Sequence, residues 1–180
     1  HGAMTLVMEE KPEVPFAHVL TRGIYSDKAD RVEATTPAAL PPMAPDAPHN
    51  RLGLAKWLVD PGNPLPARVT VNRTWYYFFG TGIVETTEDF GIMGARPSHP
   101  HLLDWLATEF VDSKWDYRHM LKLMVTSATY RQSGPVSPEK LEKHPLTRLL
   151  SRGPRYRLDA EEIRDLALSA SGLLSTKVGG

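Results

Sequence analysis

The sequence predicts a mainly α-helical fold: an orthogonal multi-helix domain of about five helices, preceded by an extended, proline-rich arm. Two observations support this prediction. From residue 50 onward, apolar residues recur at helical spacing in segments separated by proline, glycine and asparagine. Residues 5–49 instead contain seven prolines, which exclude long helices there.

The arm is expected to lie along the helical body with little regular structure. Two short apolar runs, Thr5–Met8 and Phe16–Leu20, are candidate strands of one short two-stranded β element that ends at the Arg22–Gly23 turn. Residues 36–48 should be extended and polyproline-like. The alternative interpretation of this region is a partly disordered linker.

Four long helices are expected in the body, and the first two are delimited by capping residues and breakers. The first opens at Asn50, ends near Leu58, and has as its buried face Leu54, Trp57 and Leu58. The second follows Asn63 as N-cap, with Pro64 at the first helical position, and ends at Gly80. Its apolar stripe consists of Val71, Trp75, Phe78 and Phe79.

Ser98 is the predicted cap of the third helix, with Pro100 in the first turn and His101 where a glutamate would complete a capping box. The inner face of this helix is predicted to be Leu102, Leu103, Leu106 and Phe110. Asp116 is the predicted cap of the fourth helix, whose inward residues are Leu121, Met124, Val125 and Ala128.

The remaining chain is predicted to hold a short helical turn over 138–143 and one last helix. Asp159 begins that helix, and Glu162 three residues later completes a capping box. Its apolar stripe consists of Ile163, Leu166, Ala167 and Ala170.

Composition excludes several classes of function. Lys+Arg and Asp+Glu are both 21, so the formal net charge is zero, and nucleic-acid binding, which relies on a basic surface, is disfavoured. No apolar run is long enough for a membrane span. The absence of cysteine excludes disulfides, thiolate metal sites, iron–sulfur clusters and covalent haem attachment within this chain.

Seven motifs follow one another in a recognisable order. They are RLGLAKWL from Arg51, NPLPARVTVNRTW from Asn63, FGTGIV from Phe79, DFG from Asp89, SHPHLLDWLA from Ser98, SATYRQ from Ser127 and RLDAEEIRD from Arg157. Together with Thr21-Arg-Gly in the arm, they resemble the domain of unknown function 1553, a planctomycete-specific domain also found in related bacteria.

The resemblance implies that the chain is one part of a large exported protein, located in the periplasm, the cell envelope or outside the cell. Members of this family commonly carry a second uncharacterised domain (number 1549), often a cytochrome-c-like haem module, and in some cases lectin-like modules. Haem would therefore come only from a neighbouring domain. The family usually has an acidic residue where His101 stands, and its domain continues beyond Gly180.

These considerations predict three parts in the chain. Residues 1–4 read as a cloning remnant, 5–49 as the arm, and 50–180 as a helical domain that is truncated at its C-terminal end.

Asn72 and Arg73 are the first candidate ligand-binding residues, because they flank the apolar stripe of the second helix. A guanidinium can hold a carboxylate through two hydrogen bonds, and that carboxylate would belong to a ligand or to Asp89. The internal brace is the favoured interpretation, since buried charges are normally paired within the protein.

His99 and His101 flank Pro100, and Asp104 lies one turn further on, which invites a metal hypothesis. The spacing differs from the i, i+4 pair that places two histidines on one helical face, so we predict no metal site. His99 stays a candidate general acid or base.

Four arginines precede the last helix: Arg148, Arg152, Arg155 and Arg157. Such a cluster suits sulfate, phosphate or uronate groups, but local neutralisation by acidic residues of the last helix is the favoured alternative, with Glu161, Glu162 and Asp165 as partners. Glu161 and Asp165 also share one helical face with Arg164, which fits either an acid/base pair or a charge-balanced brace.

Two further patterns are interpreted as structural. Asp89-Phe90-Gly91 spells a kinase magnesium motif without the motifs that accompany it in kinases. The tryptophans could form a sugar platform, but helical stripes favour core packing for Trp57, Trp75 and Trp105, whereas Trp115 is unassigned.

Three hypotheses of function follow. The favoured one is a non-catalytic structural or interaction module that docks other domains of the same polypeptide. The second is an enzyme or binding domain for acidic polysaccharide, with Glu161 or Asp165 as acid/base and anion contacts from His99, Arg73, Arg131, Arg157 and Arg164. The third is a docking partner of a cytochrome-c-like domain.

Overall fold

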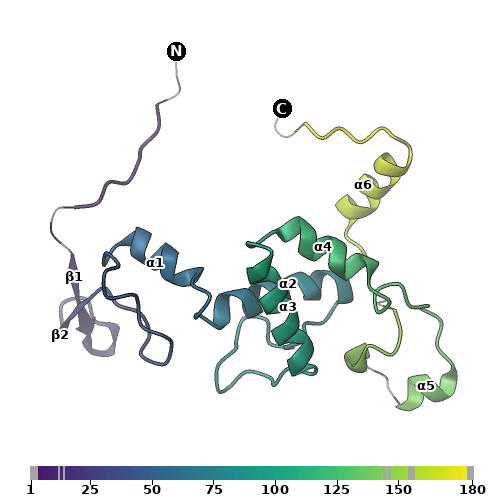
Figure 1. Cartoon of the computed structure of the whole chain (residues 1–180), viewed down its shortest axis with the longest axis horizontal. Helices are drawn as coiled ribbons and strands as arrows, with labels where there is room; N and C mark the ends of the chain where they lie inside the picture. Colours follow the sequence, from purple (N-terminus) through teal and green to yellow (C-terminus); the bar gives the residue numbers. More distant parts are fainter. Residues whose placement is uncertain are drawn as a thin grey trace. The chain divides into compact units, whose positions relative to one another are not determined.

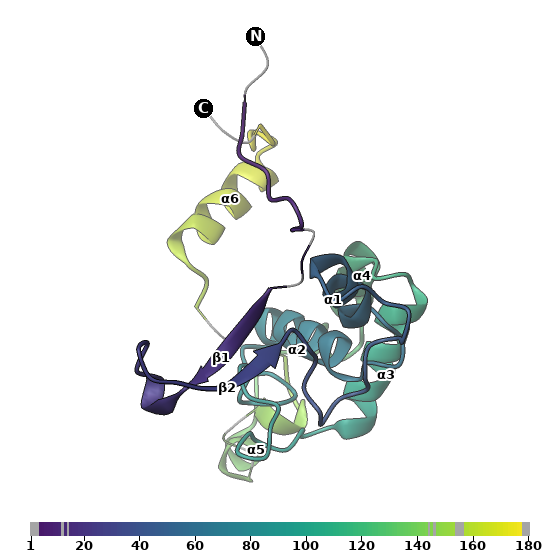
Figure 2. The ribbon, with the colours of Figure 1, turned by 90° about the vertical axis from the view of Figure 1, so that its left-hand side faces the viewer.

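The structure is a computed structural model of the 180-residue chain, and it describes residues 4–11, 13, 15–143, 145, 147–153 and 157–177. The chain divides into two compact units, His1–Arg68 and Val69–Gly180, which we call unit 1 and unit 2. Each unit is described by itself (Figures 1 and 2). Whether the N-terminal arm packs on the helices of unit 2 stays a prediction.

The fold is mainly helical, as predicted: the described residues form six α-helices and one two-stranded antiparallel sheet. Unit 1 contains the strands β1 (Phe16–Leu20) and β2 (Lys28–Glu33) and the helix α1 (Arg51–Leu58). Helix α2 (Leu65–Phe79) begins at the end of unit 1 and continues into unit 2. Unit 2 then holds α3 (Pro100–Asp112), α4 (Tyr117–Thr126), α5 (Pro138–Lys143) and α6 (Ala160–Ala170). Within the described residues, every helix is too short or too polar to cross a membrane.

The predicted strand at Phe16–Leu20 is confirmed, but its predicted partner Thr5–Met8 is wrong. The chain reverses at Arg22 (φ 51°) and Gly23 (φ 79°), so β1 pairs with the segment that follows, with Phe16 opposite Glu33 (Figure 2). Every residue of β2 is exposed, which explains why its charged sequence carried no apolar strand signal.

Helix α1 is confirmed, but its predicted buried face is wrong for Leu54 and Leu58, which are 45% and 42% exposed. The buried residues are Gly53 and Trp57, one turn apart. The proline-rich segment packs on this face: the Trp57 indole donates to the Pro41 carbonyl at 2.7 Å, and the Pro48 carbonyl lies where a Cβ of residue 53 would be. This segment, rather than the helix periodicity, selects the buried face.

The core of unit 2 is formed by one stripe from each of α2, α3 and α4, which lie close together in both views, and by two residues that follow α2 (Figures 1 and 2). Its buried apolar residues are Val71, Trp75, Phe79, Ile83, Val84, Leu103, Leu106, Ala107, Phe110, Met120 and Met124. The stripes predicted for α2 and α3 are therefore largely confirmed. In α4 the predicted Ala128 is exposed because the helix ends at Thr126, and Met120 takes the inner position instead.

Helix starts follow the predicted residues in four of five cases, beginning with Asn50, whose side chain accepts the amide of Gly53 at 3.1 Å at the start of α1. Asp116 accepts the amide of His119 at 3.0 Å, and Asp159 with Glu162 forms the expected capping box. Asn63 accepts the amide of Leu65 at the start of α2. The predicted Ser98 cap is wrong: α3 begins at Pro100 with His99 as N-cap and no side-chain cap, because Ser98 is bonded elsewhere.

Two other packing predictions are corrected. Trp105 is 51% exposed, because the buried positions of α3 (103, 106, 107 and 110) lie on the other side of that helix. The predicted stripe of α6 is also exposed, and no residue of α6 is buried in the described chain. Trp57 and Trp75 are buried as predicted, and Trp115 packs edge-on against Phe110.

Candidate functional site

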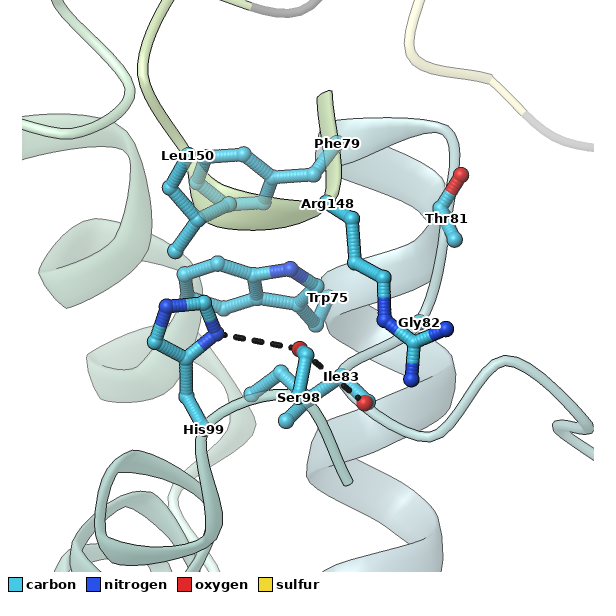
Figure 3. Close-up of a pocket in the computed structure, with 9 residues that line it drawn as sticks. All are labelled: Trp75, Phe79, Thr81, Gly82, Ile83, Ser98, His99, Arg148 and Leu150. Atoms are coloured by element: carbon cyan, nitrogen blue, oxygen red, sulfur yellow. Dashed lines mark hydrogen bonds between the residues drawn. The ribbon is translucent and has the colours of Figure 1, made fainter. Parts of the chain in front are cut away.

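A small hollow in unit 2 lies where α2 ends and the segment before α3 passes close to residues 148–150 (Figure 3). Its volume is about 20 Å³, which is room for one water molecule. Nine residues line it: Trp75, Phe79, Thr81, Gly82, Ile83, Ser98, His99, Arg148 and Leu150.

The floor of the hollow is an aromatic stack. Trp75 and Phe79 lie one turn apart on α2, and their rings stack with centroids 3.8 Å apart and planes 12° apart. Tyr130 adds an edge contact to Phe79 at 5.7 Å. Both rings of the stack are buried, so the floor of the hollow is rigid and apolar.

Polar groups on one side of the hollow form a short chain of hydrogen bonds (Figure 3). The Ser98 hydroxyl donates to the Ile83 carbonyl at 3.2 Å, and His99 Nδ1 lies 3.0 Å from the same hydroxyl oxygen. Which of the two groups donates depends on the tautomer of the histidine. Ser98 is held in place by these contacts, so we assign its hydroxyl a structural role.

Arg148 also lines the hollow (Figure 3). It contacts Glu85 at 3.5 Å and donates to the carbonyl of Arg96 at 3.3 Å. Both charged side chains of the pair are about half exposed, so the pair contributes at most about 1 kcal/mol. The acidic partner of Arg148 is thus Glu85, not the predicted Glu161, Glu162 or Asp165.

Asn72, a predicted ligand-binding residue, is fully buried beneath this region. Its side-chain amide donates to the Val84 carbonyl at 2.9 Å, and its side-chain oxygen accepts the Val84 amide at 2.8 Å. These two hydrogen bonds hold the backbone of residue 84 against α2. Gly82 passes so close to the same amide group that a Cβ there would clash with it.

The other predicted site residues are not brought into the hollow, apart from His99. Arg73, Arg131 and Arg157 are exposed and form no ion pair with any residue that the structure describes. Arg164 contacts its neighbour Asp165 at 3.2 Å on the surface, and Glu161 is exposed. Their proposed ligand contacts stay predictions.

The arginine cluster before α6 is also dispersed. Arg152 donates to the carbonyl of Pro145 at 2.9 Å, whereas Arg148 reaches Glu85. Arg155 lies outside the described residues. Arg148 and Arg152 therefore have separate partners and do not converge on one site.

Metal ligation is not favoured by the geometry near His99. Among the residues that the structure describes, no three His, Asp or Glu side chains converge on a position that could hold a metal ion. His101 and Asp104 are both exposed on α3.

Unit 1 contains a separate, larger groove of about 560 Å³. Apolar side chains line much of it, and an ion pair between Arg51 and Glu10 at 2.7 Å joins two of its lining segments. The lining includes Met8, Pro15, Ala34, Met43, His49 and Leu54. Sequence reasoning missed this groove, because its walls come from segments without regular periodicity.

The fold and its small aromatic hollow define a mainly helical domain. The chain belongs to the family PSD1, described as a protein of unknown function (DUF1553), whose model matches residues 50–180. This confirms the resemblance drawn from the sequence motifs. No curated protein and no solved structure is similar to the chain.

Proposed function

We propose that the chain is a non-catalytic interaction module of a larger exported protein and that it docks neighbouring domains of the same polypeptide. The observation that carries this proposal is the exposure of α6, an amphipathic helix with well-defined ends and no buried residue. Its apolar residues are 51% exposed at Ile163 and 61% exposed at Leu166.

The limits of α6 are encoded in its own sequence. Asp159 and Glu162 form the capping box at its start. At its end Gly172 has φ 72°, with the amides of Gly172 and Leu173 donating to the carbonyls of Ser169 and Leu168. This is the Schellman arrangement, which ends a helix sharply.

Local signals of this kind do not stabilise a short helix by themselves. Isolated helices of fewer than about 12–15 residues are marginal in water, and α6 has 11 residues. Most helical stability in proteins comes from packing of an apolar face, which the described chain does not provide for α6. A docking partner would provide it.

The identity of the partner and the location are supported by the family resemblance alone. Members of the family combine this domain with others in exported proteins, so neighbouring domains of the same polypeptide are the proposed partners. A cytochrome-c-like neighbour is one such partner, and it would contribute haem to the assembly.

Hydrogen exchange tests the proposal. Amides of α6 should exchange almost without protection in this chain alone and should be protected in the complete parent polypeptide, whereas α3 should be protected equally in both. The double substitution Ile163→Asp with Leu166→Asp should remove the protection of α6 in the parent. Unprotected α6 amides in the parent polypeptide would contradict the proposal.

A second candidate function is binding of acidic polysaccharide, and one observation favours it. Arg73, Tyr76 and Tyr77 project from one turn of α2 and are all exposed, with Tyr76 and Tyr77 in edge contact at 5.9 Å. A cation beside aromatic rings suits a sugar that carries a carboxylate or sulfate. A thermal-shift series with uronate and sulfated oligosaccharides tests it, and Arg73→Ala should abolish any shift.

A further inference from the structure

The segment between Val84 and Ser98, which we call the tip loop, is a compact surface loop with its two ends held together. The Ser98 amide donates to the Ile83 carbonyl at 2.8 Å. The Val84 backbone is held by both side-chain groups of Asn72. Loops of this length with closed ends are Ω-loops, which frequently carry function.

Further hydrogen bonds brace the loop near its apex. The Thr86 hydroxyl donates to the Asp89 carbonyl at 2.7 Å and accepts the Ala95 amide at 3.0 Å. The Asp89 carboxylate accepts the Gly91 amide at 2.7 Å, and the Gly94 amide donates to the Gly91 carbonyl at 3.1 Å. The shape of the apex is therefore determined within the loop.

This braced apex displays two large apolar side chains to solvent. Ile92 and Met93 occupy the two central positions of the turn from Gly91 to Gly94, and they are 103% and 89% exposed. Burial of either side chain in a partner would be favourable, because both are large and apolar. Because the backbone is already ordered, little conformational entropy would be lost on docking.

We propose that the apex of the tip loop inserts into an apolar pocket, bordered by basic side chains, on a neighbouring domain of the same polypeptide. The basic border follows from charge complementarity, since Glu88 and Asp89 lie just before the apex and Arg96 is the one cation among residues 84–98, whereas Glu85 is paired with Arg148. The same acidity disfavours an anionic lipid surface. This inference rests on the proposed function and adds a contact point that is distinct from α6.

The test measures binding of this chain to the neighbouring domains of the parent polypeptide, expressed without it, by biolayer interferometry. The double substitution Ile92→Asp with Met93→Asp should weaken binding at least about tenfold and leave the unfolding transition unchanged, because both side chains are exposed. Met4→Asp is the matched control, since Met4 is 99% exposed outside the loop, and it should leave binding unchanged. Raising the salt concentration should slow the association of the neighbouring domains with the unaltered chain more than their association with the Glu88→Gln variant.

Three outcomes would overturn the inference. Unchanged binding of the tip-loop variant, with binding lost in the Ile163→Asp, Leu166→Asp variant, would refute the tip contact and leave the proposed function intact. Absence of any binding to the neighbouring domains would refute both. Binding of the unaltered chain, but not of the tip-loop variant, to vesicles of equimolar phosphatidylcholine and phosphatidylglycerol would assign the apex to a lipid surface instead.

Discussion

Replacing Asn72 with alanine should destabilise unit 2 far more than the small size of the removed side chain suggests. Asn72 is 0% exposed, and its side chain forms two hydrogen bonds, at 2.8 and 2.9 Å, with the amide and carbonyl of Val84. Val84 is itself buried, at 3% exposure, so both of its backbone groups lose their partner in a place with little solvent.

The magnitude follows from the cost of leaving buried polar groups unpaired. Each such group costs about 1–3 kcal/mol, so the two together cost about 2–6 kcal/mol. The lower half of this range is expected, because a water molecule can enter the space that the amide leaves and satisfy one of the groups. A loss of about 3 kcal/mol corresponds to a decrease in Tm of roughly 6–12 °C for a chain of this size.

The assay is urea unfolding followed by tryptophan fluorescence, since Trp75 lies one turn from residue 72 in the same core. Arg73→Ala is the matched control: residue 73 is adjacent, exposed and helical, so its change should stay within about 0.5 kcal/mol. Hydrogen exchange at the Val84 amide should accelerate in Asn72→Ala and not in the control. A loss below about 1 kcal/mol for Asn72→Ala would refute this reasoning.

Three further predictions concern the core, the tip loop and a helix cap. Met120→Ala should cost about 2–5 kcal/mol in urea unfolding, because residue 120 is 1% exposed in the core, and a loss under about 1 kcal/mol would place it outside that core. Gly94→Ala should cost about 1–3 kcal/mol, because the added Cβ would overlap the Asp89 backbone. Gly91→Ala is its control: the added Cβ would meet only the movable Asp89 carboxylate, so the change should be near neutral. Thermal melts of both variants measure the difference. Asp116→Ala should cost about 1 kcal/mol through loss of the α4 cap, measured by circular dichroism, and an unchanged melt would contradict that role.

Helix positions could be predicted from the sequence because helix ends depend on residues a few positions apart. Asp116, the Asp159–Glu162 capping box and the limits of the short helix Pro138–Lys143 were all predicted correctly. The Ser98 prediction failed because a distant group competes for its side chain. The Ser98 hydroxyl donates to the carbonyl of Ile83, fifteen residues away, and a capping motif, which spans only a few residues, cannot detect such a competitor.

The candidate site could be predicted only in fragments. Helical spacing placed Trp75 and Phe79 together in the core, and they form the floor of the hollow. His99 was singled out for its chemistry, and it does line the hollow. The partner of Arg148 was not predictable, because Glu85 lies 63 residues earlier in the chain.

By itself, the sequence determined the helical class, the positions of the capped helices and the family. The tertiary structure decided which face of α1 is buried, that Asn72 is a buried backbone clamp, and that the apolar side chains of α6 and of the tip loop stay exposed. The physical reason is the range of the interactions: turns of a helix are specified by neighbouring residues, whereas burial and the partner of a polar group depend on where distant segments pass.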